Sequence, residues 1–240
     1  MTTARPSHAR LHPIQRDLRA AADAARAAAV ARFFKTGPGE YGEGDRVLGL
    51  TVPATRAIVR RWRRETTLDD ASAILRSPWH EERLAALIAL VGMHREGDSA
   101  AQRAIRDLYL ASTRHIDNWD LVDTSAAEIA GPAPNSVRTR LARSTNLWER
   151  RIAIVCTQHH VNRGDPSETF RVADLLRGDS HDLIHKAVGW LLREAGKRCS
   201  QDALVAHLRA RPDLPRTTLR YAIERFPPER RRAFLAGRFD

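Results

Sequence analysis

Residues 182–197 read DLIHKAVGWLLREAGK, and their apolar side chains recur every three or four positions. This period predicts an amphipathic helix and not a strand. Segments with the same period follow one another along the chain, and alternating β-branched runs are nearly absent. This succession of helical segments indicates an all-α fold. The apolar arc of the 182–197 helix is formed by Ile184, Val188, Leu191, Leu192 and Ala195.

Proline positions divide the remaining chain into similar helical segments. Pro53 opens one helix at its first turn, and Pro212 closes another. Consecutive antiparallel helix pairs predict a curved solenoid that forms a single domain over residues 11–240. Residues 1–10 are predicted to be a disordered tail. About thirteen helices are expected, near residues 12–35, 53–65, 68–76, 79–95, 99–114, 118–130, 134–144, 147–162, 167–177, 182–197, 200–210, 215–226 and 229–237.

Composition excludes several classes of protein. The 240 residues are 42% apolar and 29% charged, without a run of 18 apolar residues, so no membrane span is predicted. Only Cys156 and Cys199 are present, which excludes a disulfide framework and a four-cysteine zinc site. His181 and His185 are four apart, but no third ligand is evident, so no metal is expected. The start lacks the apolar stretch of a secretory signal, which predicts a cytoplasmic protein, associated with the nucleoid when it is bound to DNA.

The net charge of +11 favours a polyanionic partner, nucleic acid first. Lysine occurs only at Lys35, Lys186 and Lys197, and all other basic residues are arginines. Trp190 lies about 130° from the centre of its helix's apolar arc, on the face that carries Lys186, Arg193 and Lys197. This face can be a cation–π cluster or a helix–helix contact. Alternatively, it is a surface that binds nucleic acid, with cations on phosphates and the indole on a sugar or base.

Two helices place charges beside the predicted core. Arg151 falls inside the apolar arc of the 147–162 helix, and a buried guanidinium needs a carboxylate or a phosphate as its partner. Trp119 and Asp123, four positions apart on another helix, share a face at the margin of its apolar stripe. Asp123 beside Arg151 would give each charge its partner. A different structural ion pair is the alternative for Arg151, and the neighbouring Arg150 points to one side, where it can reach solvent.

These segments resemble the AlkD family of DNA alkylation repair glycosylases. The resemblance is carried by NWDLVD at 118–123, NLWERR at 146–151 and HKAVGWLLRE at 185–194. The loop FKTGPGEYGEGD at 34–45 and the segment PRTTLRYAIE at 215–224 are similar as well. The resemblance runs in order through nearly the whole chain after residue 12. It implies HEAT-like repeats curved around duplex DNA.

The resemblance also implies an activity. It implies base excision repair, in which positively charged N3- or N7-alkylated purines are released from duplex DNA without base flipping, metal or cofactor. By the same resemblance, Asp123 sits near the deoxyribose of the lesion, Trp119 and Trp190 pack on the backbone there, and Arg151 holds the carboxylate and the DNA. A fixed carboxylate suits this chemistry, because C1′–N cleavage develops oxocarbenium character.

Two positions depart from the family pattern. Phe33 stands where the best-known members have a tyrosine near the lesion, and Leu183 stands where an aromatic residue is expected. Both departures are expected to weaken DNA contacts without removing Asp123. The residues predicted to contact DNA are Lys186, Arg193, Lys197, Arg150 and Phe33.

Three functions compete. The first is a monofunctional glycosylase, a hydrolase acting on N-glycosyl bonds, because no lysine is placed to form a Schiff base. The second is a non-catalytic HEAT-like scaffold that binds distorted or branched DNA, and the third is a protein-interaction adaptor. The aspartate among tryptophans favours the enzyme, and the lysine-flanked indole argues against the adaptor. The expected partner is double-stranded DNA with alkylated purines, bound by a monomer.

Overall fold

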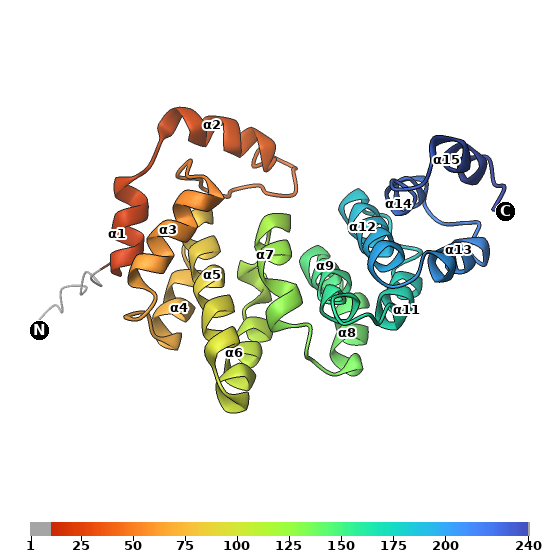
Figure 1. Ribbon diagram of the computed structural model, residues 1–240. Coiled ribbons are helices and arrows are strands. Elements are labelled where there is room, and N and C mark those ends of the chain that lie inside the picture. The colour runs from red at the N-terminus through yellow and green to blue at the C-terminus, as the bar shows by residue number, and fades with distance from the viewer. Residues whose placement is uncertain (1–10, 240) are drawn as a thin grey trace, which may run out of the picture. The chain divides into compact units, whose positions relative to one another are not determined.

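The computed structural model describes residues 11–239, and helices are the regular elements of that part (Figure 1). Fifteen α-helices and one 3₁₀-helix are present there, beside an isolated bridge between Arg46 and Trp79. The predicted all-α class is confirmed. Within 11–239, no helix is long and apolar enough to cross a membrane. The disordered tail predicted over residues 1–10 lies outside the described residues.

The chain divides into two compact units, the first ending at Gly92 and the second beginning at Met93. The single domain expected over residues 11–240 stays a prediction. The last helix of the first unit continues past the boundary. The helices that begin in this unit are α1 (Pro13–Ala20), α2 (Ala24–Phe33), α3 (Val52–Trp62), α4 (Leu68–Leu75) and α5 (His80–Glu96).

In the first unit, α1 is fixed both by apolar burial and by a buried carboxylate. Ile14 and Leu18 are fully buried, and α1 packs on α3. Glu82 of α5 is also fully buried, and it accepts hydrogen bonds from Arg19 Nε and Gln15 Nε2, each at 2.6 Å. Because a buried carboxylate is stable only when it is hydrogen-bonded or paired, these contacts hold α1 against α5.

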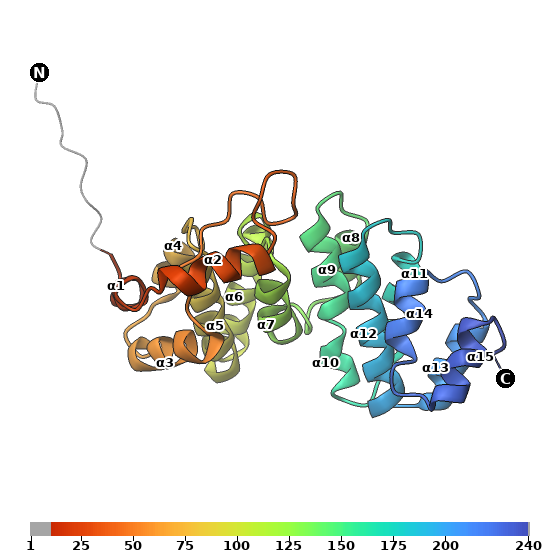
Figure 2. The ribbon, with the colours of Figure 1, turned by 90° about the horizontal axis from the view of Figure 1, so that it is seen from above.

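In the second unit, α9 contacts α7 on one side and α12 on the other (Figure 1 and Figure 2). Leu121 of α7, Ile152 of α9 and Leu191 of α12 are fully buried in this stack. Three helices far apart in sequence are therefore neighbours. The helices of this unit are α6 (Ser99–Ala111), η1 (Thr113–His115), α7 (Trp119–Ile129), α8 (Asn135–Ala142), α9 (Leu147–Val155), α10 (Gln158–Val161), α11 (Ser167–Leu175), α12 (Asp182–Arg198), α13 (Gln201–Arg209), α14 (Arg216–Ala222) and α15 (Pro228–Leu235).

Two predicted helices are each divided in the structure. The helix expected over 12–35 breaks before Asp23, whose side chain caps α2 by accepting from the Arg26 N–H at 2.9 Å. The Asp23 N–H donates to the Leu48 carbonyl at 2.9 Å, so the break is anchored by a tertiary contact. The helix expected over 147–162 is divided into α9 and α10. These two divisions account for the difference between the about thirteen expected helices and the fifteen α-helices within residues 11–239.

Candidate active site and nucleic-acid interface

Each of the three neighbouring helices begins at a side-chain cap. Asn118 accepts a hydrogen bond from the Trp119 N–H at 2.8 Å, and α7 begins there. Asn146 accepts from the Trp148 N–H at 2.8 Å at the start of α9, and His181 accepts from the Leu183 N–H at 3.1 Å at the start of α12. Such caps satisfy N–H groups that the first helical turn leaves without partners. They fix where each helix starts, and therefore which face each later residue occupies.

Asp123 of α7 and Arg151 of α9 form a bidentate ion pair. Arg151 Nε donates to Asp123 Oδ1 at 2.9 Å, and Nη2 donates to Oδ2 at 2.8 Å. The Arg151 side chain is 7% exposed and that of Asp123 is 21% exposed. The fork geometry matches both carboxylate oxygens, which is the strongest arrangement of these groups. The predicted pairing is confirmed, and one carboxylate edge remains accessible.

The same guanidinium also reaches α12. Arg151 Nη1 donates to the Leu183 carbonyl oxygen at 2.7 Å. Arg151 thus connects α7, α9 and the first turn of α12. The contact uses the backbone of residue 183, so it does not depend on the leucine side chain. This role could not be predicted from the sequence, because every residue has a backbone carbonyl and the residue type does not show which one accepts a hydrogen bond.

Burial controls the protonation of Asp123. Burial raises the pKa of Asp123 above its ordinary value of 3.8, and the nearby negative charge of Asp120 adds to the rise. The coulombic attraction and the hydrogen bonds of Arg151 act in the opposite direction. Arg151 therefore favours the ionised form of a carboxylate that its surroundings would protonate more readily.

Two other carboxylates lie on the same helices. Asp120 is buried in the first turn of α7, with 8% of its surface exposed. Glu149 of α9 accepts a hydrogen bond from Thr113 Oγ1 at 2.8 Å.

The tryptophans differ in burial. Trp148 of α9 is 7% exposed and packs in the core. Trp119 and Trp190 are half-buried. Trp119 lies one helical turn before Asp123, so both residues occupy the same face of α7. The prediction that Trp190 lies off the apolar arc of α12 is confirmed, since Ile184 and the other four arc residues are at most 2% exposed.

The cations predicted to contact DNA are in different states. Lys186 Nζ lies 2.7 Å from Asp182 Oδ2, one turn earlier on α12, and its side chain is 42% exposed. Lys197 is exposed. Arg193 pairs with Glu224, just after the end of α14, and its side chain is 17% exposed. Their DNA contacts stay predictions.

Arg150 is held by the protein itself. Its Nε donates to Asp179 Oδ2 at 2.6 Å, and its Nη1 donates to the carbonyls of Ser144 at 3.1 Å and Thr145 at 2.9 Å. These contacts tie the start of α9 to the loop before α12. The side chain is 18% exposed, so its predicted reach to solvent is limited. Its contact with DNA stays a prediction.

Phe33 belongs to the first unit. Its side chain is exposed, with 65% of its surface accessible at the end of α2. Its ring centroid lies 5.5 Å from that of Phe34, which is buried. The contact of Phe33 with DNA stays a prediction.

The histidines at the start of α12 have structural partners. His181 Nδ1 accepts from the Leu183 N–H, and His185 Nε2 is hydrogen-bonded to the Asp179 carbonyl at 2.5 Å. Within residues 11–239, no three His, Cys, Asp or Glu side chains group as metal ligands.

The fold and the site define a class of protein. It is an all-α protein in which three adjacent helices hold a mostly buried aspartate–arginine pair, and two of these helices carry half-buried tryptophans. A family model described as DNA alkylation repair enzyme matches residues 14–226, and the chain belongs to this family. The resemblance inferred from the sequence is thereby confirmed. Membership supports a role in DNA repair and an enzymatic function.

A solved structure has the same fold. It is described as a predicted DNA alkylation repair enzyme from Enterococcus faecalis, with a TM-score of 0.67 and 14% identity. The similarity covers 86% of this chain and 97% of that one. No curated protein matches the chain.

Proposed function

We propose that the protein is a monofunctional DNA glycosylase, which hydrolyses the N-glycosidic bond of positively charged N3- or N7-alkylated purines in duplex DNA without flipping the base. The observation that supports this proposal is the bidentate Asp123–Arg151 pair. A protein that only binds DNA needs cations on its surface. It does not need a carboxylate that both nitrogens of a guanidinium fork hold in a mostly buried position.

The chemistry requires little beyond that carboxylate. An N3- or N7-alkylated purine carries a positive charge, so it leaves with the C1′–N electron pair as a neutral base. The C1′ centre becomes an oxocarbenium-like cation, which the negative charge of Asp123 stabilises. A water oxygen then bonds to C1′ and loses a proton to solvent, leaving an abasic site. In this scheme Trp119 and Trp190 pack against the sugar–phosphate backbone and hold C1′ near the carboxylate.

Arg151 has a supporting role in this scheme. Burial makes a charge more effective, because the low dielectric strengthens its field, but burial also favours the protonated carboxyl. The guanidinium offsets that tendency while it fixes the position of both oxygens. Arg151 is therefore a positioning residue, and Asp123 is the catalytic one.

The experiment is single-turnover release of base from methylated duplex DNA, followed by chromatography, with spontaneous depurination subtracted. Asp123→Asn should lower the excision rate of 3-methyladenine or 7-methylguanine at least about tenfold, since a stabilising group of this kind is worth about 10²–10³ in rate. DNA affinity should stay near normal. The amide places a donor against Arg151 Nη2, so the assay is run well below the unfolding temperature of the variant.

Asp107→Asn is the matched control. Asp107 is an exposed residue of α6 in the same unit, so this variant loses the same charge away from the pair. It should keep the wild-type rate. If the wild type releases no base above background, the protein is a DNA-binding scaffold. If Asp123→Asn keeps the full rate of an active wild type, Asp123 is not the catalytic carboxylate, and Asp120 or Glu149 takes its place in the test.

A further inference from the structure

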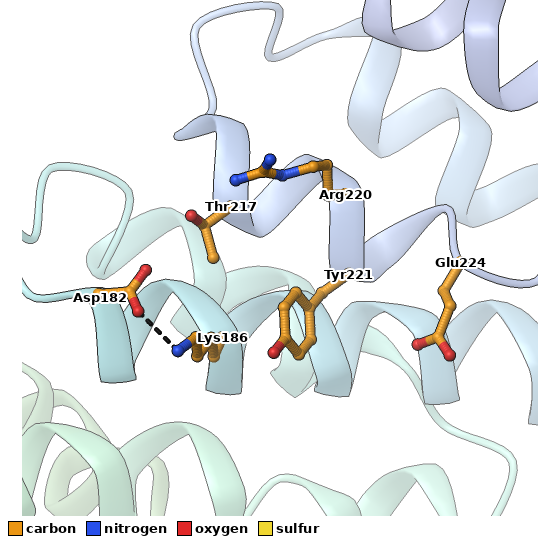
Figure 3. A pocket seen from close by; sticks show the side chains of 6 residues that line it. All are labelled: Asp182, Lys186, Thr217, Arg220, Tyr221 and Glu224. Atoms are coloured by element: carbon orange, nitrogen blue, oxygen red, sulfur yellow. Dashed lines mark ion pairs between the residues drawn. The ribbon is translucent and has the colours of Figure 1, made fainter.

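A groove of about 630 Å³ lies between α12 and α14. Figure 3 shows its side chains from close by, with the Asp182–Lys186 ion pair on α12 and the remaining four side chains on or just after α14. The Arg220 guanidinium extends toward Thr217, and the Tyr221 ring reaches down toward α12. None of the α14 residues belongs to the site described above. The lining is Asp182, Lys186, Thr217, Arg220, Tyr221 and Glu224.

The walls of the groove are held close together at Gly189. A Cβ atom at this position would lie 2.5 Å from Tyr221 Cβ and 2.6 Å from the Thr218 carbonyl oxygen, so α14 crosses α12 where no side chain intervenes. Thr218 Oγ1 donates to the His185 carbonyl at 3.2 Å one turn earlier. The groove is therefore a fixed feature of the two packed helices.

The two carboxylates of the groove are paired with cations, whereas its arginine makes no ion pair in the described part of the chain. Asp182 holds Lys186 at 2.7 Å, and Glu224 is paired with Arg193. Arg220 is exposed, and it makes no ion pair within residues 11–239. After each carboxylate has taken one cation, the groove keeps one guanidinium whose five donors are available to an anion.

We propose that this groove binds a phosphodiester of the DNA backbone, with Arg220 as its main cation. This proposal rests on the proposed function in one respect, which is that DNA is the ligand. The guanidinium fork fits two phosphate oxygens, and the Thr217 hydroxyl, which hydrogen-bonds to the Asp182 carboxylate, borders the same space. Tyr221, 37% exposed, offers its ring to the adjacent deoxyribose.

The position of the groove favours a backbone over a free anion. Lys186 lines it and lies one helical turn before Trp190, so the groove continues the same face of α12 toward the candidate site. A strand that packs on Trp190 would place its neighbouring phosphates along this face. The opposing carboxylates Asp182 and Glu224 disfavour a small free anion, which gains no other contact to offset their repulsion.

Asp182 has a second role in this proposal. Its ion pair with Lys186 competes with phosphate for the same ammonium group. Asp182→Asn removes the competitor and one repulsive charge, so it should tighten DNA binding. Weaker binding of Asp182→Asn would overturn this competition.

The test is binding of unmodified duplex DNA, measured by fluorescence anisotropy between 50 and 200 mM salt, for the full chain and Arg220→Ala. Each phosphate contact contributes about 0.9 to the log–log slope, so over this fourfold rise in salt it accounts for a loss of affinity of about 3.5-fold. Arg220→Ala should lower the log–log slope by the contribution of one phosphate contact, and Arg220→Lys should restore the wild-type slope. Because Arg220 is exposed, both variants should fold, which circular dichroism checks.

Arg140→Ala is the matched control. Arg140 is an exposed residue at the end of α8, outside the groove, and its loss changes the net charge by the same amount. It should leave the slope unchanged. An unchanged slope for Arg220→Ala, or an equal change for both variants, would overturn the proposal. The use of unmodified DNA separates this proposal from the proposed function. A protein that releases no base can still lose part of the salt dependence of its DNA affinity in Arg220→Ala. Competition by inorganic phosphate as strong as that by duplex would assign the groove to a free anion.

Discussion

Arg151→Ala removes the group that joins three helices, and its cost can be estimated from the contacts it breaks. The change deletes the bidentate pair with Asp123 and the hydrogen bond to the Leu183 carbonyl. Removing one partner of a fully buried pair costs about 3–5 kcal/mol. Because Asp123 is 21% exposed, water can partly solvate the stranded carboxylate, and we expect a loss of about 2–4 kcal/mol in the free energy of unfolding.

The pairing itself is measured by a double-mutant cycle. Asp123→Ala, Arg151→Ala and the double variant are unfolded in urea and followed by tryptophan fluorescence and circular dichroism. The chain has two compact units, so two transitions are fitted where they separate, and only the one that reports the second unit should move. The double variant should be more stable than the sum of the single losses predicts, by about 1–3 kcal/mol.

A second cycle provides the scale. Arg95 and Glu128 also form an ion pair in the second unit, with Arg95 Nε 2.8 Å from Glu128 Oε2, but their side chains are 64% and 31% exposed. An exposed pair of this kind is typically worth about 0.2–1 kcal/mol. Additivity of Asp123→Ala and Arg151→Ala within about 0.5 kcal/mol would show that their contact does not stabilise the fold, and it would refute the role given to Arg151.

Three further outcomes are expected. Trp190→Ala should damage DNA binding or excision more than folding, with a loss in unfolding free energy below the range of about 3–5 kcal/mol for a core tryptophan; a loss within that range with intact activity would make Trp190 a core residue. Gly189→Ala should destabilise the second unit by about 1–3 kcal/mol, because its Cβ overlaps Tyr221 of α14, and an unchanged urea midpoint would contradict this packing. The excision rate should be full at high pH and fall as the pH drops through the raised pKa of Asp123; a single-turnover profile with a midpoint at or below 3.8 would contradict the direction of that shift.

The Asp123–Arg151 pair could be predicted because its signal is local. A charged residue inside an apolar arc must find a partner, and the helical period places Arg151 inside such an arc. A carboxylate at the margin of another core face is the kind of partner required. That step depends only on residue type and on the angle between successive helical residues.

Other features depend on distant contacts. Nothing in the residues near Arg193 indicates that Glu224 pairs with it, because α14, which ends just before Glu224, is brought to α12 by the crossing at Gly189. The break before α2 is likewise fixed by a hydrogen bond from Asp23 to the Leu48 carbonyl. The helical period of the sequence continues through the break before α2. The sequence therefore predicts one helix where tertiary contacts divide the chain into two.

Arg151 also explains why the site needs an arginine and not merely a positive charge. Two of its nitrogens hold the carboxylate of Asp123 on α7, and the third donates to the first turn of α12 in a different direction. A lysine ammonium has three donors on one atom and cannot match both carboxylate oxygens and the carbonyl in a fixed plane. The carboxylate and the helix that carries Trp190 are thus positioned by one rigid group. The spacing between the proposed catalytic charge and the proposed backbone contact is therefore set by the guanidinium plane, and the Leu183 side chain does not enter it because only its carbonyl takes part.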